Sequence, residues 1–455
     1  MYHGIMSSLS LPPLLMRTFG SLRVRNYRLY FSAQLVSMSG TWMQSVAQGW
    51  LVLRLTGSGV ILGVTVALQF GPVLVLGPWG GLLADRIDKR RLMLVTQTAM
   101  AVLALALGAF TLAGAASVPL IWALAVLTGV CNAADNPARQ SFVVEMVGRE
   151  ELANAVGLNS VIVNGSRLIG PAVAGVLIYT AGVAVCFLIN GASFLVVIAA
   201  LLAMRPAELR RSAPLARAKG QVRAGLAYAW RTPQLRVPLL MMAVVSTLGY
   251  NFSVLMPLLA QDVFHRGGGT YGALSAAMGA GALAGALFAA ARARPTRLLL
   301  VGATLAFGCF TMLIGAAPSL TGAFLLLVPM GAAAILFVAT VNSLLQLNSA
   351  AAMRGRVMAL WAVLFLGSTP IGGPLTGWIA GVVGVRWTFV AAGAATLLTA
   401  CAAAVALRRQ TWRVGAHELA AAMPDDPACA HPAPLPVTRP PRRMAWQLRH
   451  RRRRR

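Results

Sequence analysis

Charged residues are scarce in this sequence. Lys, Arg, Asp and Glu make up 11% of its 455 residues, and only 11 residues are acidic. A soluble globular domain has roughly 25% charged residues. Hydrophobic residues make up 58% of the chain, and the mean hydropathy is +0.73. This shortage of charge excludes an ordinary soluble protein and indicates that most segments lie in lipid.

Several kinds of reactive site are missing as well. The sequence has no glycine-rich phosphate loop ending in Lys-Ser or Lys-Thr, which excludes ATP as a direct energy source. The five cysteines have no paired spacing, so we expect neither disulfides nor Cys-based metal sites. No paired carboxylates or Ser-His arrangement falls within an apolar span, which argues against an enzyme.

Histidine is absent from the apolar segments, because the five histidines lie outside them: His3, His265, His417, His431 and His450. This excludes haem, zinc and histidine proton relays from the membrane. We therefore predict no catalytic residue, no cofactor and no metal site.

The basic residues that are present give a formal net charge of +28. They stand at the ends of apolar segments and in one C-terminal tail, and no folded basic domain holds them. We therefore expect no nucleic-acid partner.

The chain contains twelve apolar segments near or above the ~18–20 residues needed to cross a bilayer. All must be helices, because lipid offers no hydrogen bonds to an exposed backbone. We predict an all-α integral membrane protein with spans at residues 28–53, 58–83, 92–113, 119–140, 152–179, 183–204, 235–262, 270–291, 297–317, 320–347, 355–383 and 385–407.

Basic residues also predict the orientation of these spans. With both termini on one side, only Arg54, Arg266 and Arg386 fall on the far side, and Arg167 falls inside a helix. The other thirty-five of the thirty-nine Lys and Arg lie on the side of the termini. Cytoplasmic loops carry the Lys/Arg excess, so we predict that both termini are cytoplasmic.

The predicted organisation has five parts. Residues 1–27 form a cytoplasmic arm, 28–204 a six-helix half, 205–234 a basic cytoplasmic linker, and 235–407 a second six-helix half. Residues 408–455 are proline-rich and end in five arginines, a composition that predicts disorder. This tail either lies on anionic lipid or is dispensable.

The two halves share a weak repeat. Asn136 precedes Gly170-Pro171 by 34 residues, and Asn342 precedes Gly373-Pro374 by 31 residues. Repeated halves are typical of transporters that work by alternating access.

The most specific motif joins the second and third spans. It reads Gly81-Leu82-Leu83-Ala84-Asp85-Arg86-Ile87-Asp88-Lys89-Arg90-Arg91 and resembles the signature loop of the major facilitator superfamily. The six-plus-six layout over residues 28–407 is similar to that superfamily too. Asp88 stands where the signature usually has glycine. Because aspartate tolerates left-handed backbone better than most residues, we expect the turn to be kept.

The resemblance implies that Gly81, Asp85, Arg86, Lys89 and Arg90 form a conformational latch. A carboxylate at Asp85 can accept the terminal amides of a helix or an arginine of the other half. Such a contact would exist in one conformation only. A plain positively charged loop is the alternative.

A second resemblance lies in the fifth span, where Gly165, Gly170, Pro171 and Gly175 are similar to the antiporter motif of drug-exporting branches. Ordinary glycine-mediated helix packing is the alternative. Residues 135–140, 151–155 and 354–360 resemble the enterobactin-exporter-like branch.

Together these resemblances imply a secondary active transporter. It would export small molecules such as drugs, siderophores or other secondary metabolites by alternating access, driven by protons. Import of a small solute by the same fold is the alternative. We expect a monomer in the bacterial inner membrane, with a small-molecule substrate and membrane lipid as its partners.

Polar residues within spans are expensive and usually face a bundle interior or a cavity. The first span carries a stripe at intervals of three and four, which lies on one helix face. We assign to a substrate cavity Gln34, Ser37, Thr41, Gln44, Gln48, Asn132, Asn164, Arg167, Asn251, Asn342 and Gln346. In the superfamily the first, fourth, seventh and tenth helices line this cavity. Interhelical hydrogen bonding is the alternative for the stripe.

Arg167 and Asp135 are the charged residues of greatest interest. Arg167 lies near mid-membrane, where a guanidinium needs a partner or water. It receives an anionic substrate group, or it braces Asp135 or a backbone carbonyl. Asp135 is the candidate proton carrier, because burial favours a neutral carboxyl whereas Arg139 or Arg167 would favour the carboxylate. A structural ion pair with Arg139 is the alternative.

Overall fold

The computed structural model describes residues 20–148, 150–210, 221–292 and 295–408. Every element in these residues is helical, which confirms the all-α prediction. The predicted arm before residue 20 and the predicted tail after residue 408 lie outside the described residues.

The first half contains six long helices. The short η1 (Gly20–Arg23) precedes them and η2 (Pro206–Glu208) follows them. The six are α2 (Arg25–Thr56), α3 (Gly59–Arg86), α4 (Lys89–Leu112), α5 (Val118–Val147), α6 (Leu152–Thr180) and α7 (Val183–Ala203).

The second half is less regular. It begins with α8 (Gln221–Arg231), which lies within the range predicted as a linker. The seventh span consists of α9 (Pro233–Val244), η3 (Val245–Gly249), α10 (Phe252–Leu258) and η4 (Leu259–Val263). Three single helices follow: α11 (Gly268–Ala291), α12 (Arg297–Ala316) and α13 (Leu320–Asn348). The eleventh span consists of α14 (Ala351–Gly367) and α15 (Thr369–Val383), and the twelfth is α16 (Val385–Arg408).

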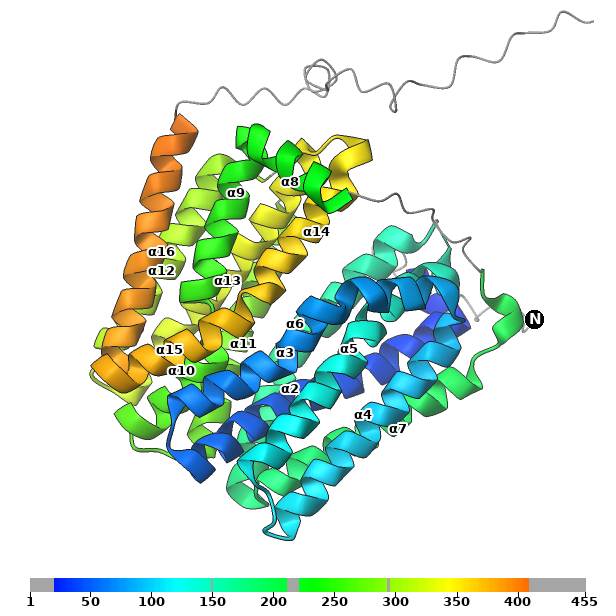
Figure 1. The fold of residues 1–455 in the computed structure, drawn as a ribbon, viewed down its shortest axis with the longest axis horizontal. Coiled ribbons are helices and arrows are strands. Elements are labelled where there is room, and N and C mark those ends of the chain that lie inside the picture. Colours follow the sequence, from blue (N-terminus) through cyan, green and yellow to red (C-terminus); the bar gives the residue numbers. More distant parts are fainter. Residues whose placement is uncertain (1–19, 149, 211–220, 293–294, 409–455) are drawn as a thin grey trace, which may run out of the picture. The chain divides into compact units, whose positions relative to one another are not determined.

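The same packing scheme occurs in both halves. In the first half, α3 packs on α5, α4 on α7, and α4 on α5. In the second half, α11 packs on α13, α12 on α16, and α12 on α13. Each half is therefore a six-helix bundle built on one plan (Figure 1).

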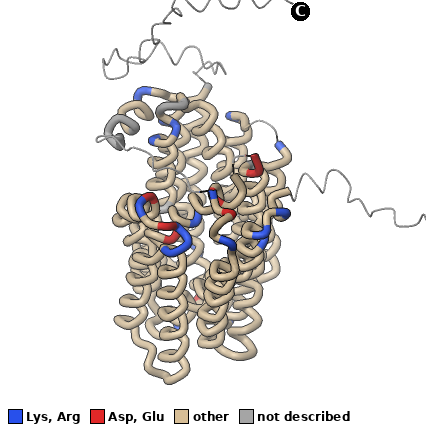
Figure 2. The backbone as a smooth tube through the Cα atoms, turned by 90° about the vertical axis from the view of Figure 1, so that its right-hand side faces the viewer, with Lys and Arg blue, Asp and Glu red and all other residues tan. Residues whose placement is uncertain are grey.

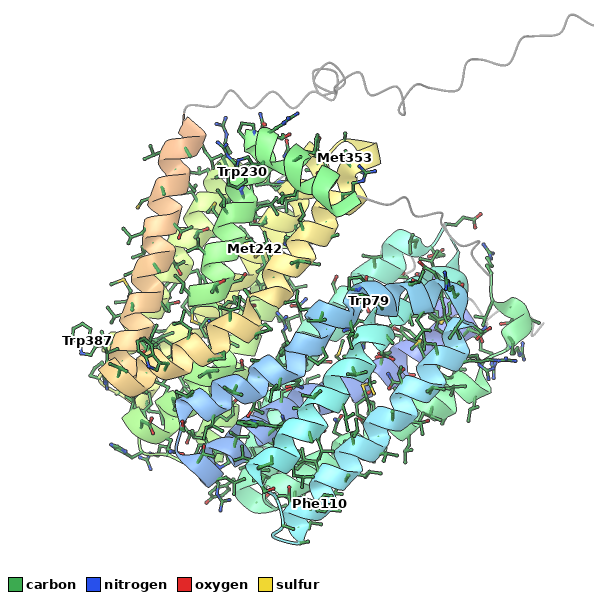
Figure 3. All side chains as sticks on the ribbon, viewed as in Figure 1. Trp79, Phe110, Trp230, Met242, Met353 and Trp387 are labelled. Atoms are coloured by element: carbon green, nitrogen blue, oxygen red, sulfur yellow. The ribbon has the colours of Figure 1, made fainter. Side chains whose placement is uncertain are left out.

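Eleven spans in the described part of the chain are long and apolar enough to cross a membrane. The twelfth is α2, whose 32 residues extend about 48 Å at 1.5 Å per residue. Its length is sufficient, but its polar stripe lowers its hydropathy. Large apolar side chains such as Trp387 and Phe110 are exposed on the outside of the bundles (Figure 3), as expected for a lipid-facing surface.

Two spans of the second half are interrupted. The seventh contains two π-helical turns, η3 and η4, on either side of a break at Tyr250 and Asn251. The eleventh bends between α14 and α15 next to Pro370 (Figure 1), where proline removes a backbone donor. Asn251 is buried, so the irregular backbone of the seventh span is covered by protein, as a membrane requires.

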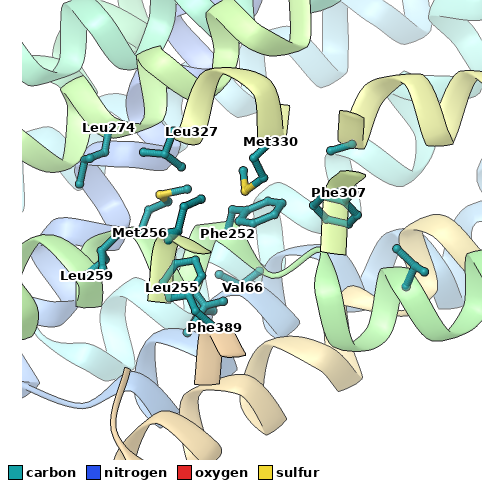
Figure 4. Close-up of a cluster of buried hydrophobic side chains, with 14 of the residues drawn as sticks. Val66, Phe252, Leu255, Met256, Leu259, Leu274, Phe307, Leu327, Met330 and Phe389 are labelled. Carbon is teal, nitrogen blue, oxygen red and sulfur yellow. The ribbon is translucent and has the colours of Figure 1, made fainter. Parts of the chain in front are cut away.

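The hydrophobic core of the second half joins its helices around the seventh span. Phe252 and Leu255 of α10 lie among Phe307, Met330 and Phe389 of three other helices (Figure 4). All five side chains are buried. This core holds the interrupted span in place.

Charged side chains gather toward one end of the bundles (Figure 2). We call this the basic end; it includes the starts of α4 and α12, at Lys89 and Arg297, and the end of α8, at Arg231. The opposite, or far, end includes the starts of α3 and α11.

The two halves contact each other mainly through α3 with α15 and through α6 with α11. Near the far end, Gly63 lies against the backbone of Gly373, and Gly272 lies against that of Gly175. A side chain at Gly63 or Gly272 would overlap the opposite backbone. Toward the basic end the helices of the two halves diverge (Figure 1).

Candidate functional site

A small polar cavity of about 60 Å³ lies inside the first half. Residues of α2, α3, α4, α5 and α7 line it. The predicted residues that line it are Ser37, Thr41, Gln44, Asn132 and Asp135. The helical periodicity of the α2 stripe therefore turns three of its members toward α5.

Asp135 is the acidic group of this cavity, and its side chain is 1% exposed. Its Oδ1 accepts hydrogen bonds from Thr96 Oγ1 at 2.8 Å and from Gln97 Nε2 at 3.1 Å, both on α4. Two neutral donors therefore hold one carboxyl oxygen. Thr96 and Gln97 were not among the predicted residues, because those all lie on the first, fourth, fifth, seventh and tenth spans. Gln97 is a polar residue within the third span, and this alone could have indicated that it faces the bundle interior.

Arg139 follows Asp135 by one turn of α5. Its Nε is 4.0 Å from Asp135 Oδ2, whereas its Nη2 donates to Asn136 Oδ1 at 2.6 Å and its Nη1 reaches Gln34 Oε1 at 3.5 Å. The guanidinium thus has stronger contacts with neutral amides than with the carboxylate.

The cluster holds unused hydrogen-bonding capacity. Gln97 Oε1 and Gln34 Nε2 are buried without a hydrogen-bond partner, as is Tyr30 Oη on α2. Gln97 contacts Asp135, and Gln34 contacts Arg139. Because buried polar groups are normally satisfied, this site has the capacity to bind water or a polar group.

The polar stripe of α2 also contacts a neighbouring helix. Gln44 Oε1 accepts a hydrogen bond from Asn190 Nδ2 of α7 at 2.7 Å, and Gln48 is buried. The stripe therefore both lines the cavity and forms an interhelical hydrogen bond.

The other predicted residues lie outside this cavity: Gln34, Gln48, Asn164, Arg167, Asn251, Asn342 and Gln346. Asn251 donates to the Thr247 carbonyl at 2.7 Å in the seventh span. Asn342 accepts a hydrogen bond from Gln346 within α13. The structure thus brings five predicted residues of the first half together, while four others of that half and the three of the second half lie outside this cavity.

Arg167 lies on α6, at the edge of the contact with α11. Its guanidinium carbon is 5.1 Å from the centre of the Trp42 ring, a cation–π distance. Its Nε is buried without a hydrogen-bond partner, and in the described part of the chain no ion pair links it to Asp135. Its backbone carbonyl packs against Gly279 of α11, so the two halves are in close contact at this residue.

The signature loop is anchored within the first half. Asp88 accepts a hydrogen bond from the Arg91 amide at 3.0 Å and caps α4. Lys89 Nζ pairs with Glu145 Oε1 at 2.6 Å, and Arg90 Nε donates to the Leu201 carbonyl at 2.6 Å. Asp85 lies in the last turn of α3.

Asp88 joins α3 to α4 without left-handed backbone. Its φ is −54° and its ψ is 118°. Aspartate at this position serves as a helix N-cap, where a short acceptor is favoured, and a glycine there would not supply that hydrogen bond.

The glycines of the fifth span have different surroundings. Gly170 packs against the backbone of Ser39 and the side chain of Trp42, and Gly175 packs against Gly269 and Gly272. Gly165 faces open space. Gly170 thus joins α6 to α2, and Gly175 joins the two halves.

Comparisons with known proteins extend over most of the chain. The sequence model of the transmembrane secretion effector family matches residues 16–430. The chain is 28% identical over 391 residues to the multidrug efflux pump Tap of Mycobacterium tuberculosis, covering 84% of this chain and 92% of that protein. It is 27% identical over 360 residues to the enterobactin exporter EntS of Shigella boydii, covering 77% and 84%.

A shorter match is 26% identical over 247 residues to the staphyloferrin A transporter of Staphylococcus aureus, covering 52% of this chain and 60% of that protein. A match to an MFS-type transporter of Bacillus subtilis covers 51% of that protein. The chain therefore spans between half and two thirds of these two relatives.

Solved structures share the fold. A bacterial homologue of the human lysosomal transporter Spinster, in an inward-facing and unoccupied conformation, superimposes with a TM-score of 0.68 at 16% identity, covering 85% of this chain and 97% of that one. The nucleoside transporter NupG gives a TM-score of 0.68 at 12% identity, covering 85% and 99%.

Proposed function

This chain belongs to the transmembrane secretion effector family of the major facilitator superfamily, and on that premise we propose that it exports small molecules from a bacterial cytoplasm. Export is coupled to proton entry and proceeds by alternating access. The observation that carries this proposal is the carboxyl group of Asp135, buried among neutral donors inside a membrane bundle.

The proton coupling follows from the arrangement around Asp135. Thr96 and Gln97 donate to Oδ1 of the carboxyl group, and neither donates to Oδ2. Arg139 stabilises the carboxylate from 4.0 Å, and its bond to Asn136 does not depend on the charge of Asp135. We propose that this carboxyl group carries the coupling proton. The sequence offers no nucleotide site as another energy source.

Alternating access is supported by the contacts between the halves. They meet near the far end through glycines such as Gly63 and Gly272 and diverge toward the basic end (Figure 1). With both termini in the cytoplasm, this conformation is open to the cytoplasm. The latch at Asp85 forms when the basic ends come together.

The substrate carries an anionic group, and Arg167 receives it. Two features support this assignment: the cation lies over Trp42, and its Nε is buried without a hydrogen-bond partner. Drugs, siderophores and other secondary metabolites that bear a carboxylate or a similar anion fit this site.

Everted membrane vesicles test the direction and the energy source. Vesicles with the chain should accumulate such a compound when a proton gradient is applied, and a protonophore should abolish the accumulation. Vesicles without the chain are the control. Accumulation by right-side-out vesicles instead would identify an importer.

A further inference from the structure

A long groove runs along the outside of the second half, between α11 and α12 over α13. Its volume is about 660 Å³. Small residues form its floor and walls, including Ala284, Gly302, Ala306 and Ala332. A side chain added at Gly302 would meet open space. Side chains therefore do not fill the groove.

The groove is apolar along its length and charged at one end. Leu299, Phe310 and Leu336 line the apolar part. At the basic end, Arg292 lies 5.4 Å from the centre of the Phe288 ring. Arg292 therefore places a positive charge at this end of the groove, beside the Phe288 ring, which is half exposed.

Its dimensions match one leaflet of a bilayer. The groove extends along α12 from Leu298 to Phe310, a rise of about 18 Å at 1.5 Å per residue. Half the thickness of a hydrocarbon core is about 15 Å. Leu298 is 82% exposed, so the groove opens outward to the surrounding lipid.

We propose that this groove binds an acyl chain of an anionic phospholipid, with its phosphate on Arg292. The lining offers water too few polar partners. A hydrocarbon chain from the bilayer is therefore the occupant that fits its apolar walls. A basic residue at the mouth selects an anionic headgroup, as basic pockets between transmembrane helices do. This site is independent of the Asp135 cluster and of the proposed substrate.

Native mass spectrometry of the full-length protein tests the proposal. The purified chain is offered equal amounts of phosphatidylglycerol and phosphatidylcholine with identical acyl chains. Wild type should retain phosphatidylglycerol preferentially. Arg292→Gln should lower that preference about fivefold, and Arg292→Lys should keep most of it. Gly302→Leu fills the groove and should lower the retention of both lipids.

Two matched variants control for changes elsewhere. Arg236→Gln removes another arginine stacked on an aromatic ring, Trp230 at 5.8 Å, and Gly381→Leu fills open space on α15. Both should retain lipid like wild type. Equal retention of the two lipids by wild type, or equal effects of Arg236→Gln and Arg292→Gln, would overturn the proposal. Unchanged retention in a monodisperse Gly302→Leu protein would overturn it too.

Discussion

Arg139 and Asp135 stand one helical turn apart on α5, yet 4.0 Å separates Arg139 Nε from Asp135 Oδ2. Arg139 makes its shortest contact, at 2.6 Å, with Asn136. Asp135 is held by Thr96 and Gln97. Each residue of the pair therefore has contacts of its own that hold its position besides the contact between the two.

The orientation rests on the distribution of basic residues and can be tested by fusions. Alkaline phosphatase fused after residue 55, 115, 267 or 318 should be active, because the predicted orientation places these loops outside the cytoplasm. Fusions after residue 90, 220 or 295 should be inactive. The reverse pattern would contradict the predicted orientation.

The Asp85 latch depends on charge. Asp85→Asn keeps the size of the side chain but weakens a charge-assisted contact, so we expect transport to fall about tenfold while the protein still inserts. Asp88→Asn is the control in the same loop, because asparagine also caps helices well. Equal transport rates for Asp85→Asn and wild type would make Asp85 an ordinary loop residue.

Arg167 should affect anionic substrates selectively. Arg167→Gln should raise the KM for an anionic compound about tenfold and leave that for a neutral compound near wild type. Arg167→Lys keeps the charge but loses the planar stacking group, so its effect should be smaller. A similar rise for both compounds would indicate that Arg167 has a structural role.

The far-end glycines should control which end is open. Gly63→Leu or Gly272→Leu places a side chain against opposing backbone and should force the halves apart there. Spin labels on cysteines that replace Ile87 and Arg354, near the basic end, should then move closer together. Gly381→Leu, in open space, should leave the distance unchanged. No change in the Gly63 and Gly272 variants would show that the two ends move independently.

Much of the fold could be predicted from the lengths of the apolar segments in the sequence. The predicted spans correspond to the observed helices, and α2 was recognisable despite its polar stripe because that stripe keeps to one face. The bend beside Pro370, the break after Gly249 and the π-helical turn after Pro257 also have visible causes in the sequence.

The partners within the site were harder to predict. Periodicity gives the face on which Asp135 lies, but not that Thr96 and Gln97 of another helix will meet it. The contact depends on how α4 packs against α5, which close-packed side chains decide. Likewise the signature loop gave no sign that Asp88 would cap α4 while Lys89 paired with Glu145.

The central claim is that Asp135 carries the coupling proton, and proton-driven accumulation in everted vesicles tests it most directly. Asp135→Asn retains hydrogen bonding but cannot release a proton, so it should bind substrate normally and show no accumulation that depends on the pH gradient. Asp262→Asn changes an exposed carboxylate outside the cavity and should accumulate substrate like wild type. Full gradient-driven accumulation by Asp135→Asn would contradict the account.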